Sequence, residues 1–221
     1  MSPEIIRLIV ESTLDTLAMV GLAGLFGTAL GVPLGIFLAT SRAGELFAAP
    51  VANRIVGVVV NATRSTPFII LVVAIVPFTR LVVGTSIGTA AATVPLTIAA
   101  IPFIARVIEA AIREVDHGLI EAARAFGASP LQIVRKVLLP EALPAITLAL
   151  TLTVVSLIGY SAMVGAVGGG GLGDLGIRYG YQRFMPEVML TVVLVLIVLV
   201  QGVQTLGDTL ARKLDHRSRR S

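Results

Sequence analysis

Few side chains in this sequence could carry out covalent or metal chemistry. The chain has no cysteine and two histidines, His117 and His216, which lie far apart in polar segments. A thiol nucleophile and a disulfide framework are therefore excluded, and a metal cluster is not indicated. The two lysines, Lys136 and Lys213, are not followed by serine or threonine, as the standard phosphate-binding loop requires. We predict that the chain is not an enzyme and holds no catalytic residue, metal or cofactor.

A polar stretch from Arg106 to Pro140 offers the chemistry of contact instead. Asp116 is placed to cap the start of a short helix, and Gly127 to end it in the left-handed conformation. Three apolar side chains recur along this helix at helical spacing: Leu119, Ala123 and Phe126. Such an amphipathic helix fits a hydrophobic groove on a partner, although a surface linker between two membrane helices explains the pattern equally well.

A second helix is predicted directly after the first. Ser129 fits the N-cap, Pro130 the first turn, and Gln132 the third position of a capping box, whose side chain reaches back to the N-cap backbone. We expect this helix to continue through Leu138 and to end at Pro140. The stretch therefore reads as a helix, a tight turn and another helix.

The elements that flank this stretch are long and apolar. Hydrophobic residues make up 56% of the 221 and charged residues 14%, which indicates an integral membrane protein of the all-α class. The net charge of +4 is better explained by membrane orientation than by binding to nucleic acid. Five segments long enough to cross a bilayer as helices predict five transmembrane spans: residues 16–41, 55–79, 81–105, 142–167 and 188–207.

Three of these spans carry features that bear on packing or on a pathway. Glycines recur at three- and four-residue intervals in the first span, so a neighbouring helix can approach it closely. Arg64 interrupts the second span: it either reaches the interface from a shorter span or faces a wet cavity in a translocation path. Pro95 and Pro102 predict kinks in the third span, which either shape a pathway or are purely structural.

The glycine run 168–173 matches the spacing of a dinucleotide-binding loop. That loop works only between a strand and a helix, whereas this run follows a membrane span, so we predict a flexible, tightly packed turn instead. The segment after it is polar and aromatic, which predicts a loop at the membrane interface or against a docking partner. Its residues are Arg178, Tyr179, Tyr181, Gln182 and Arg183.

The positive-inside rule orients the five spans. With the N-terminus outside, twelve basic residues lie inside: Arg42, Arg54, Arg106, Arg113, Arg124, Arg135, Lys136, Arg212, Lys213, Arg217, Arg219 and Arg220. Four lie outside: Arg7, Arg80, Arg178 and Arg183. We therefore predict that residues 1–11 form a periplasmic segment, that the polar stretch is cytoplasmic, and that residues 207–221 form a basic cytoplasmic tail.

The acidic residues bear on how transport would be driven. A gradient-driven carrier usually has an ionisable residue in the middle of the membrane. Here five acidic residues lie at or near span ends: Asp15, Glu109, Glu141, Glu187 and Asp208. This favours a transporter driven by a partner, and it leaves a gradient-driven secondary transporter or a channel as the alternative from another class.

Several segments resemble a known family, and together they cover nearly the whole chain. Bacterial ABC importer permeases carry an EAA loop similar to Glu121-Ala122-Ala123, Gly127 and Val137-Leu138-Leu139-Pro140. Permeases of methionine importers, in the binding-protein-dependent transport permease family, are similar at Thr16-Leu17-Ala18-Met19, at the run from Pro67 through Pro77-Phe78-Thr79-Arg80 to Gly84-Thr85-Ser86-Ile87-Gly88, and at Gly159-Tyr160-Ser161-Ala162-Met163. The string Arg64-Ser65-Thr66-Pro67-Phe68 also resembles a segment of amino-acid importer permeases.

The resemblance implies a fold and a set of partners. It implies a type I ABC importer permease fold, with an ABC type-1 transmembrane domain over residues 12–206 and an EAA coupling loop over residues 116–140. It also implies a homodimer in the lipid bilayer of the bacterial inner membrane, two cytoplasmic ATPase subunits that bind ATP and Mg, and an extracytoplasmic methionine-binding protein. A permease for another amino acid would share all these features.

We assign two sets of site residues on this basis. The coupling set would contact the ATPase: Leu119, Glu121, Ala122, Ala123, Phe126 and Gly127. The path set would lie along the translocation pathway: Arg64, Tyr160, Ser161 and Met163. In the path set, Met163 would provide a soft, adaptable gate for a thioether substrate.

Overall fold

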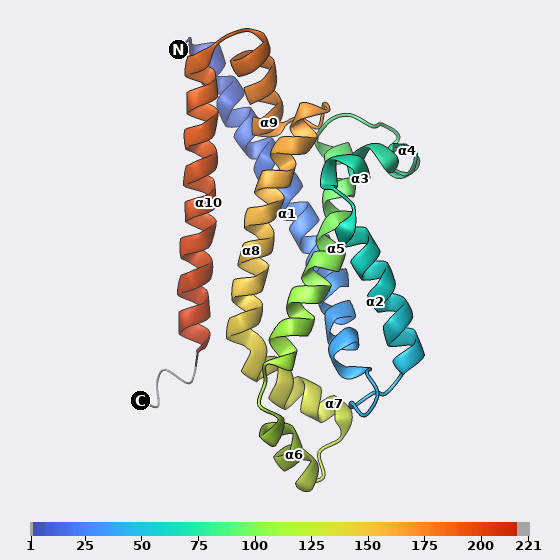
Figure 1. The fold of residues 1–221 in the computed structure, drawn as a ribbon. Coiled ribbons are helices and arrows are strands. Elements are labelled where there is room, and N and C mark those ends of the chain that lie inside the picture. The colour runs from blue at the N-terminus through green and yellow to red at the C-terminus, as the bar shows by residue number, and fades with distance from the viewer. Residues whose placement is uncertain (1, 216–221) are drawn as a thin grey trace.

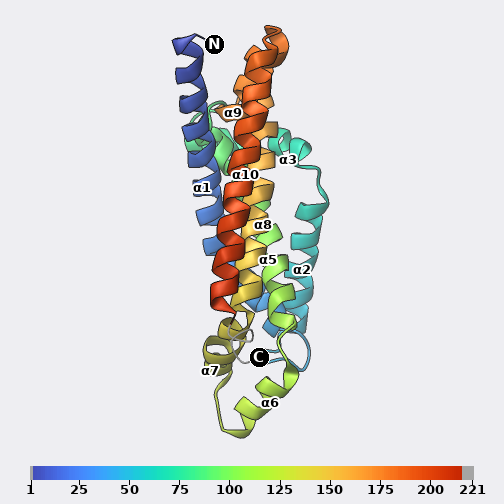
Figure 2. The same cartoon turned by 90° about the vertical axis from the view of Figure 1, so that its left-hand side faces the viewer.

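The computed structural model describes residues 2–215, and within that range every regular element is a helix (Figure 1). The long helices run side by side in an elongated bundle (Figure 2). α1 (Pro3–Thr40) begins at one end, and α10 (Pro186–Leu214) ends at the other, where α6 (His117–Ala125) and α7 (Pro130–Ile133) also lie. Part of the predicted basic tail falls outside the described residues: His216, Arg217, Arg219 and Arg220.

Short helices connect the long ones. The others are α2 (Pro50–Ser65), α3 (Phe68–Ala74), α4 (Val76–Val83), α5 (Thr89–Arg113), the π-helical turn η1 (Val134–Leu138), α8 (Leu139–Ala166), α9 (Gly171–Leu175) and the π-helical segment η2 (Gly176–Gln182). Over residues 2–215, four helical segments are long and apolar enough to cross a membrane, and α2 with α3 makes a fifth if that bent pair is one span. This confirms the all-α membrane class.

The second predicted span, 55–79, is not one helix. The chain bends by 102° between α2 and α3. Pro67 lies at the break, and Thr66 before it has φ −80° and ψ 124°, because proline disfavours the helical conformation of the residue that precedes it. α4 follows directly and ends at Val83, after which Gly84, with φ 83°, turns the chain. One apolar run therefore forms three short helices.

The first and third spans also differ from their predicted bounds. α1 is helical from Pro3, well before the predicted start of the first span. α5 begins at Thr89, after a turn at Gly88 with φ 93°, and continues past Arg106 to Arg113. The helix thus runs past residue 105, where the third span was predicted to end, because Arg106 and Glu109 pair with each other and leave the helix intact.

α1 and α5 pack closely through part of the predicted glycine face. A Cβ atom added at any of three glycines would lie 2.7–2.8 Å from atoms of α5, closer than real Cβ contacts allow. These positions are Gly27, Gly31 and Gly35. The predicted close approach is confirmed here, whereas Gly21 has no atom within 4 Å of such a Cβ.

The second helix of the polar stretch does not end at Pro140. α7, η1 and α8 form one continuous helical segment from Pro130 to Ala166, 37 residues long. Proline has no backbone N–H and would clash with the carbonyl group four residues earlier in a regular helix. The π-helical turn η1 precedes Pro140 and leaves it in the first turn of α8, where its missing N–H breaks no α-helical bond. The polar stretch is thus joined to α8 without a loop.

The end of the bundle where α1 begins has a small core of its own. It consists of Ile9, Leu172, Leu175, Val188 and Val192. The backbone N–H of Leu172 donates a hydrogen bond of 2.9 Å to the hydroxyl oxygen of Thr16, which ties α9 to α1. The predicted tight turn is confirmed for the first half of the glycine run, where Gly168 and Gly170 have positive φ, whereas α9 already begins at Gly171. The predicted loop that follows is wrong, because Gly176–Gln182 is helical.

Candidate functional site

The helix-turn-helix of the polar stretch is fixed by its own capping groups. The Asp116 carboxylate accepts the N–H of Gly118 at 2.7 Å, and Gly127 has φ 77°. The Ser129 hydroxyl accepts the N–H of Gln132 at 3.4 Å, while the Gln132 side chain accepts the N–H of Ser129 at 2.8 Å. The predicted N-caps, left-handed glycine and capping box are all confirmed.

The apolar side chains of this helix divide between two directions. Phe126 is 91% exposed and Leu119 is 41% exposed. Ala123, predicted on the same face, is half-buried and packs with Ile120 against the chain's own core. The three remaining members of the coupling set are exposed: Glu121, Ala122 and Gly127. The surface available to a partner is therefore centred on Phe126 and Leu119.

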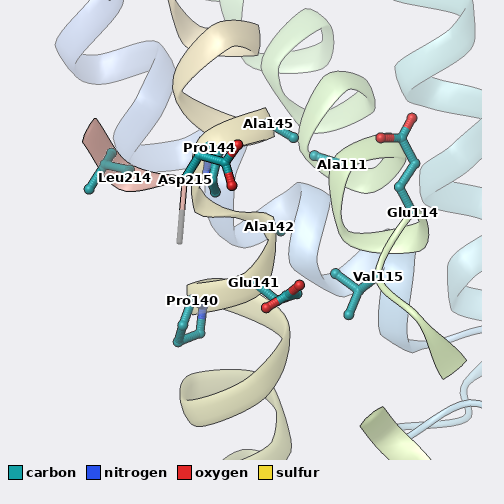
Figure 3. Close-up of a pocket in the computed structure, with 10 residues that line it drawn as sticks. All are labelled: Ala111, Glu114, Val115, Pro140, Glu141, Ala142, Pro144, Ala145, Leu214 and Asp215. Atoms are coloured by element: carbon teal, nitrogen blue, oxygen red, sulfur yellow. The ribbon is translucent and has the colours of Figure 1, made fainter. Parts of the chain in front are cut away.

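The helix-turn-helix projects from the end of the bundle where α5 ends and α8 begins (Figures 1 and 2). A cavity of about 240 Å³ lies beside this junction (Figure 3). Its wall includes Val115, in the connection between α5 and α6, and Pro140 and Glu141 at the start of α8. The described residues contain no group of three or more His, Cys, Asp or Glu side chains that could hold a metal ion.

Two members of the predicted path set share a second cavity, of about 230 Å³. Arg64 at the end of α2 and Tyr160 on α8 both line it. Tyr160 stacks on Phe68 with ring centroids 4.5 Å apart and planes 14° apart, and the Arg64 guanidinium lies 5.9 Å from the Phe103 ring centroid. Arg64 therefore lines this cavity while remaining an exposed residue near the end of α2.

The other two members of the path set lie outside this cavity. Ser161 is 3% exposed, and its hydroxyl donates to the carbonyl oxygen of Ile158 at 2.7 Å. Met163 is 48% exposed and does not line the cavity. Phe68 and Phe103, which were not predicted, supply aromatic walls instead. The signal for Phe68 was its place directly after the helix break at Pro67.

Comparisons with known proteins identify the family of this chain. Residues 31–220 match the family model described as the binding-protein-dependent transport system inner membrane component. The probable D-methionine transport system permease protein MetI of Vibrio cholerae is 57% identical over 210 residues, 95% of this chain and 93% of that protein. The D-methionine transport system permease protein MetI of Escherichia coli K12 is 53% identical over 165 residues, 75% of this chain and 76% of that protein.

Solved structures share the fold. An inward-facing structure of the MetNI methionine ABC transporter aligns with a TM-score of 0.95 at 51% identity, over 98% of this chain and 100% of that chain. An amino acid ABC transporter solved with histidines aligns with a TM-score of 0.79 at 21% identity, over 95% of each chain, which shows the fold alone. With most of its length matched by the family model and by these relatives, this chain belongs to the family of inner membrane components of binding-protein-dependent transport systems.

Proposed function

We propose that this chain forms the translocation pathway of an ABC importer for methionine. It would act as a homodimer, driven by two separate cytoplasmic ATPase subunits and supplied by an extracytoplasmic methionine-binding protein. The observation that carries the proposal is the capped helix α6, whose exposed Phe126 would dock into an ATPase, joined by the short turn at Gly127 to the segment Pro130–Ala166, which continues without a loop through α8 and Tyr160. The high identity to relatives named for methionine transport supports the substrate.

The proposed mechanism is alternating access by movement of packed helices. ATP-driven closure of the ATPase dimer would draw the two α6 helices together. The continuous segment from Pro130 to Ala166 would carry this motion to Tyr160 and change its stacking on Phe68. The cytoplasmic side of the pathway would then close as the outer side opens.

We expect Tyr160→Ala to reduce methionine uptake several-fold in reconstituted vesicles, because a stacked aromatic pair contributes about 1 kcal/mol beyond its buried area. Tyr160→Phe keeps the ring and should transport near the wild-type rate. Met163→Ala should also slow uptake if this exposed side chain contacts the substrate along the pathway. Normal transport by both alanine variants would remove these residues from the proposed path.

The orientation of the proposed permease can be tested by labelling, because the natural chain has no cysteine. Arg212 is exposed near the end of α10. A cysteine introduced by Arg212→Cys should react with a membrane-impermeant maleimide only in inside-out vesicles, whose cytoplasmic face is accessible. Tyr181 lies at the opposite end of the bundle and is 69% exposed. A cysteine introduced by Tyr181→Cys should react only in intact spheroplasts. The reverse pattern would contradict an N-terminus outside and a C-terminus inside.

Gentle purification and uptake assays distinguish the proposal from its rivals. A stoichiometric ATPase should copurify, and vesicles loaded with ATP should take up methionine in preference to other amino acids when the binding protein is supplied. Preference for a different amino acid would keep the importer class and change the substrate. Uptake that persists without ATP and without any ATPase subunit would instead indicate a gradient-driven carrier or a channel.

A further inference from the structure

Glu109, near the end of α5, is a charged side chain in the buried interior. It is 4% exposed. Its two carboxylate oxygens accept hydrogen bonds from two arginines, at 2.7 Å from Arg42 Nη2 and at 2.5 Å from Arg106 Nη1. The Arg113 guanidinium lies farther away, with Nη1 at 3.9 Å, and that side chain is about half exposed. Glu109 therefore has two close partners that come from different parts of the chain.

Arg106 extends this network to α2. Its Nη2 donates to the backbone carbonyl oxygen of Gly57 at 2.9 Å, and the side chain is 20% exposed. Asn53 provides a second polar link nearby, since its side-chain amide donates to the carbonyl oxygen of Leu38 and to the hydroxyl oxygen of Ser41, both at 2.9 Å. The network therefore joins three elements: the end of α1, α2 and α5.

The apolar contact that holds α2 in this place is small. Val60 is the buried residue of α2, and its core cluster contains two further buried side chains, Leu38 and Ala105. The outward side of α2 carries exposed apolar residues, among them Val51, Ile55 and Val58. With so little buried apolar area, the attachment of α2 depends on the charged network, and a buried charge that loses its partner is far more costly than an exposed one.

The network connects α6 with the cavity that Phe68 and Tyr160 line. α5 ends at Arg113 and α6 begins at His117, so a displacement of α6 acts directly on the end of α5. On the other side, α2 leads through the break at Pro67 to Phe68, which stacks on Tyr160. The Glu109 network is the link that would make α2 follow α5.

We propose that Glu109 is a positioning residue that holds α2 to α5 through Arg106, and the end of α1 to α5 through Arg42, so that movement of α6 reaches Phe68 at the cavity. The inference rests on the proposed importer function. Without the network, the ATPase would still dock and hydrolyse ATP, but α2 and Phe68 would no longer follow α5.

The test uses the complete complex of permease and ATPase in vesicles, with radiolabelled methionine, binding protein and ATP. For Glu109→Gln we expect ATP hydrolysis near the wild-type rate and methionine uptake about tenfold lower, because the arginines lose their buried countercharge. The ratio of ATP hydrolysed to methionine transported should then rise about tenfold, a change that simple loss of folded protein would not produce. An unchanged ratio would overturn the proposal.

A matched control lies on the same helix end. Glu114 is exposed and five positions further along, and Glu114→Gln should leave the ratio unchanged. Hydrogen exchange of the α2 amides gives a second measurement, and it should be faster in Glu109→Gln and unaffected in Glu114→Gln. Equal α2 protection in Glu109→Gln and the wild type would also contradict the role assigned to Glu109.

A milder variant decides the matter if Glu109→Gln fails to assemble. Arg42 is 42% exposed on its side chain, and Arg42→Gln removes one of the two close partners while Arg106 remains. We expect its ratio of ATP to methionine to rise about threefold, as befits a partly exposed pair, and an unchanged ratio would again count against the proposal. Failure of the wild-type complex to import methionine would refute the proposed function. The rate of hydrogen exchange at the α2 amides in Glu109→Gln would still test the role of the network.

Discussion

Valine in place of Gly127 should uncouple the permease from its ATPase. Gly127 has φ 77°, and no atom lies within 4 Å of a Cβ built there, so the cost of valine is purely conformational. Holding an L residue in this region costs about 2 kcal/mol, roughly a thirtyfold fall in the population of the correct turn. We expect ATPase copurification and ATP-dependent uptake to fall together, while the permease stays inserted and dimeric.

Gly127→Asn is the matched control for this experiment. Asparagine adopts the left-handed conformation more readily than valine, so it should retain most of the association with the ATPase. A Gly127→Val permease that binds the ATPase as tightly as the wild type would show that the turn does not position α6 for docking. Phe126→Asp would then test the exposed surface without changing the turn.

Gly31→Val should cause the largest loss of stability of any substitution considered. A Cβ atom at Gly31 would lie 2.8 Å from the Cβ of Ile104 and 2.9 Å from the carbonyl oxygen of Ile101, so α1 and α5 would have to separate. Overpacking of this kind costs about 3 kcal/mol. We expect little monodisperse protein after extraction in detergent, and a lower thermal midpoint for what remains.

The same helix provides the control for Gly31→Val. Gly21 has nothing within 4 Å of a Cβ, so Gly21→Val should behave like the wild type in extraction and in thermal unfolding. The comparison separates the steric effect from the change in helix propensity, which is similar at the two positions. Equal stability of the two variants would contradict the close α1–α5 contact.

Local signals in the sequence predicted local structure well. The caps at Asp116 and Ser129 and the turn at Gly127 depend on groups a few residues apart, and the structure has all three. Hydropathy was less informative about direction, because an apolar run has the same composition whether it stays straight or bends at Pro67. The signal for that bend was present, but composition over a long window does not register it.

Charges misled the prediction of helix ends for a related reason. Arg106 and Glu109 looked like the border of a span, yet they form a buried pair within α5. The Arg106–Glu109 pair follows from its three-residue spacing, but Arg42, the other close partner of Glu109, lies far away in the sequence, so the burial of this charge cannot be read from spacing along the chain. The cavity shows the same limit: Arg64 and Tyr160 were predicted for the path, but the aromatic contacts of Phe68 and Phe103 depend on how α2, α3, α5 and α8 meet.

The unbroken connection between the coupling loop and α8 has a mechanical consequence. At about 1.5 Å per residue, a helical segment of 37 residues is roughly 55 Å long, so a tilt of about 10° at one end displaces the other by about 10 Å. In the proposed importer such a segment would act as a lever, in which a short stroke beside the ATPase gives a wide swing near Tyr160.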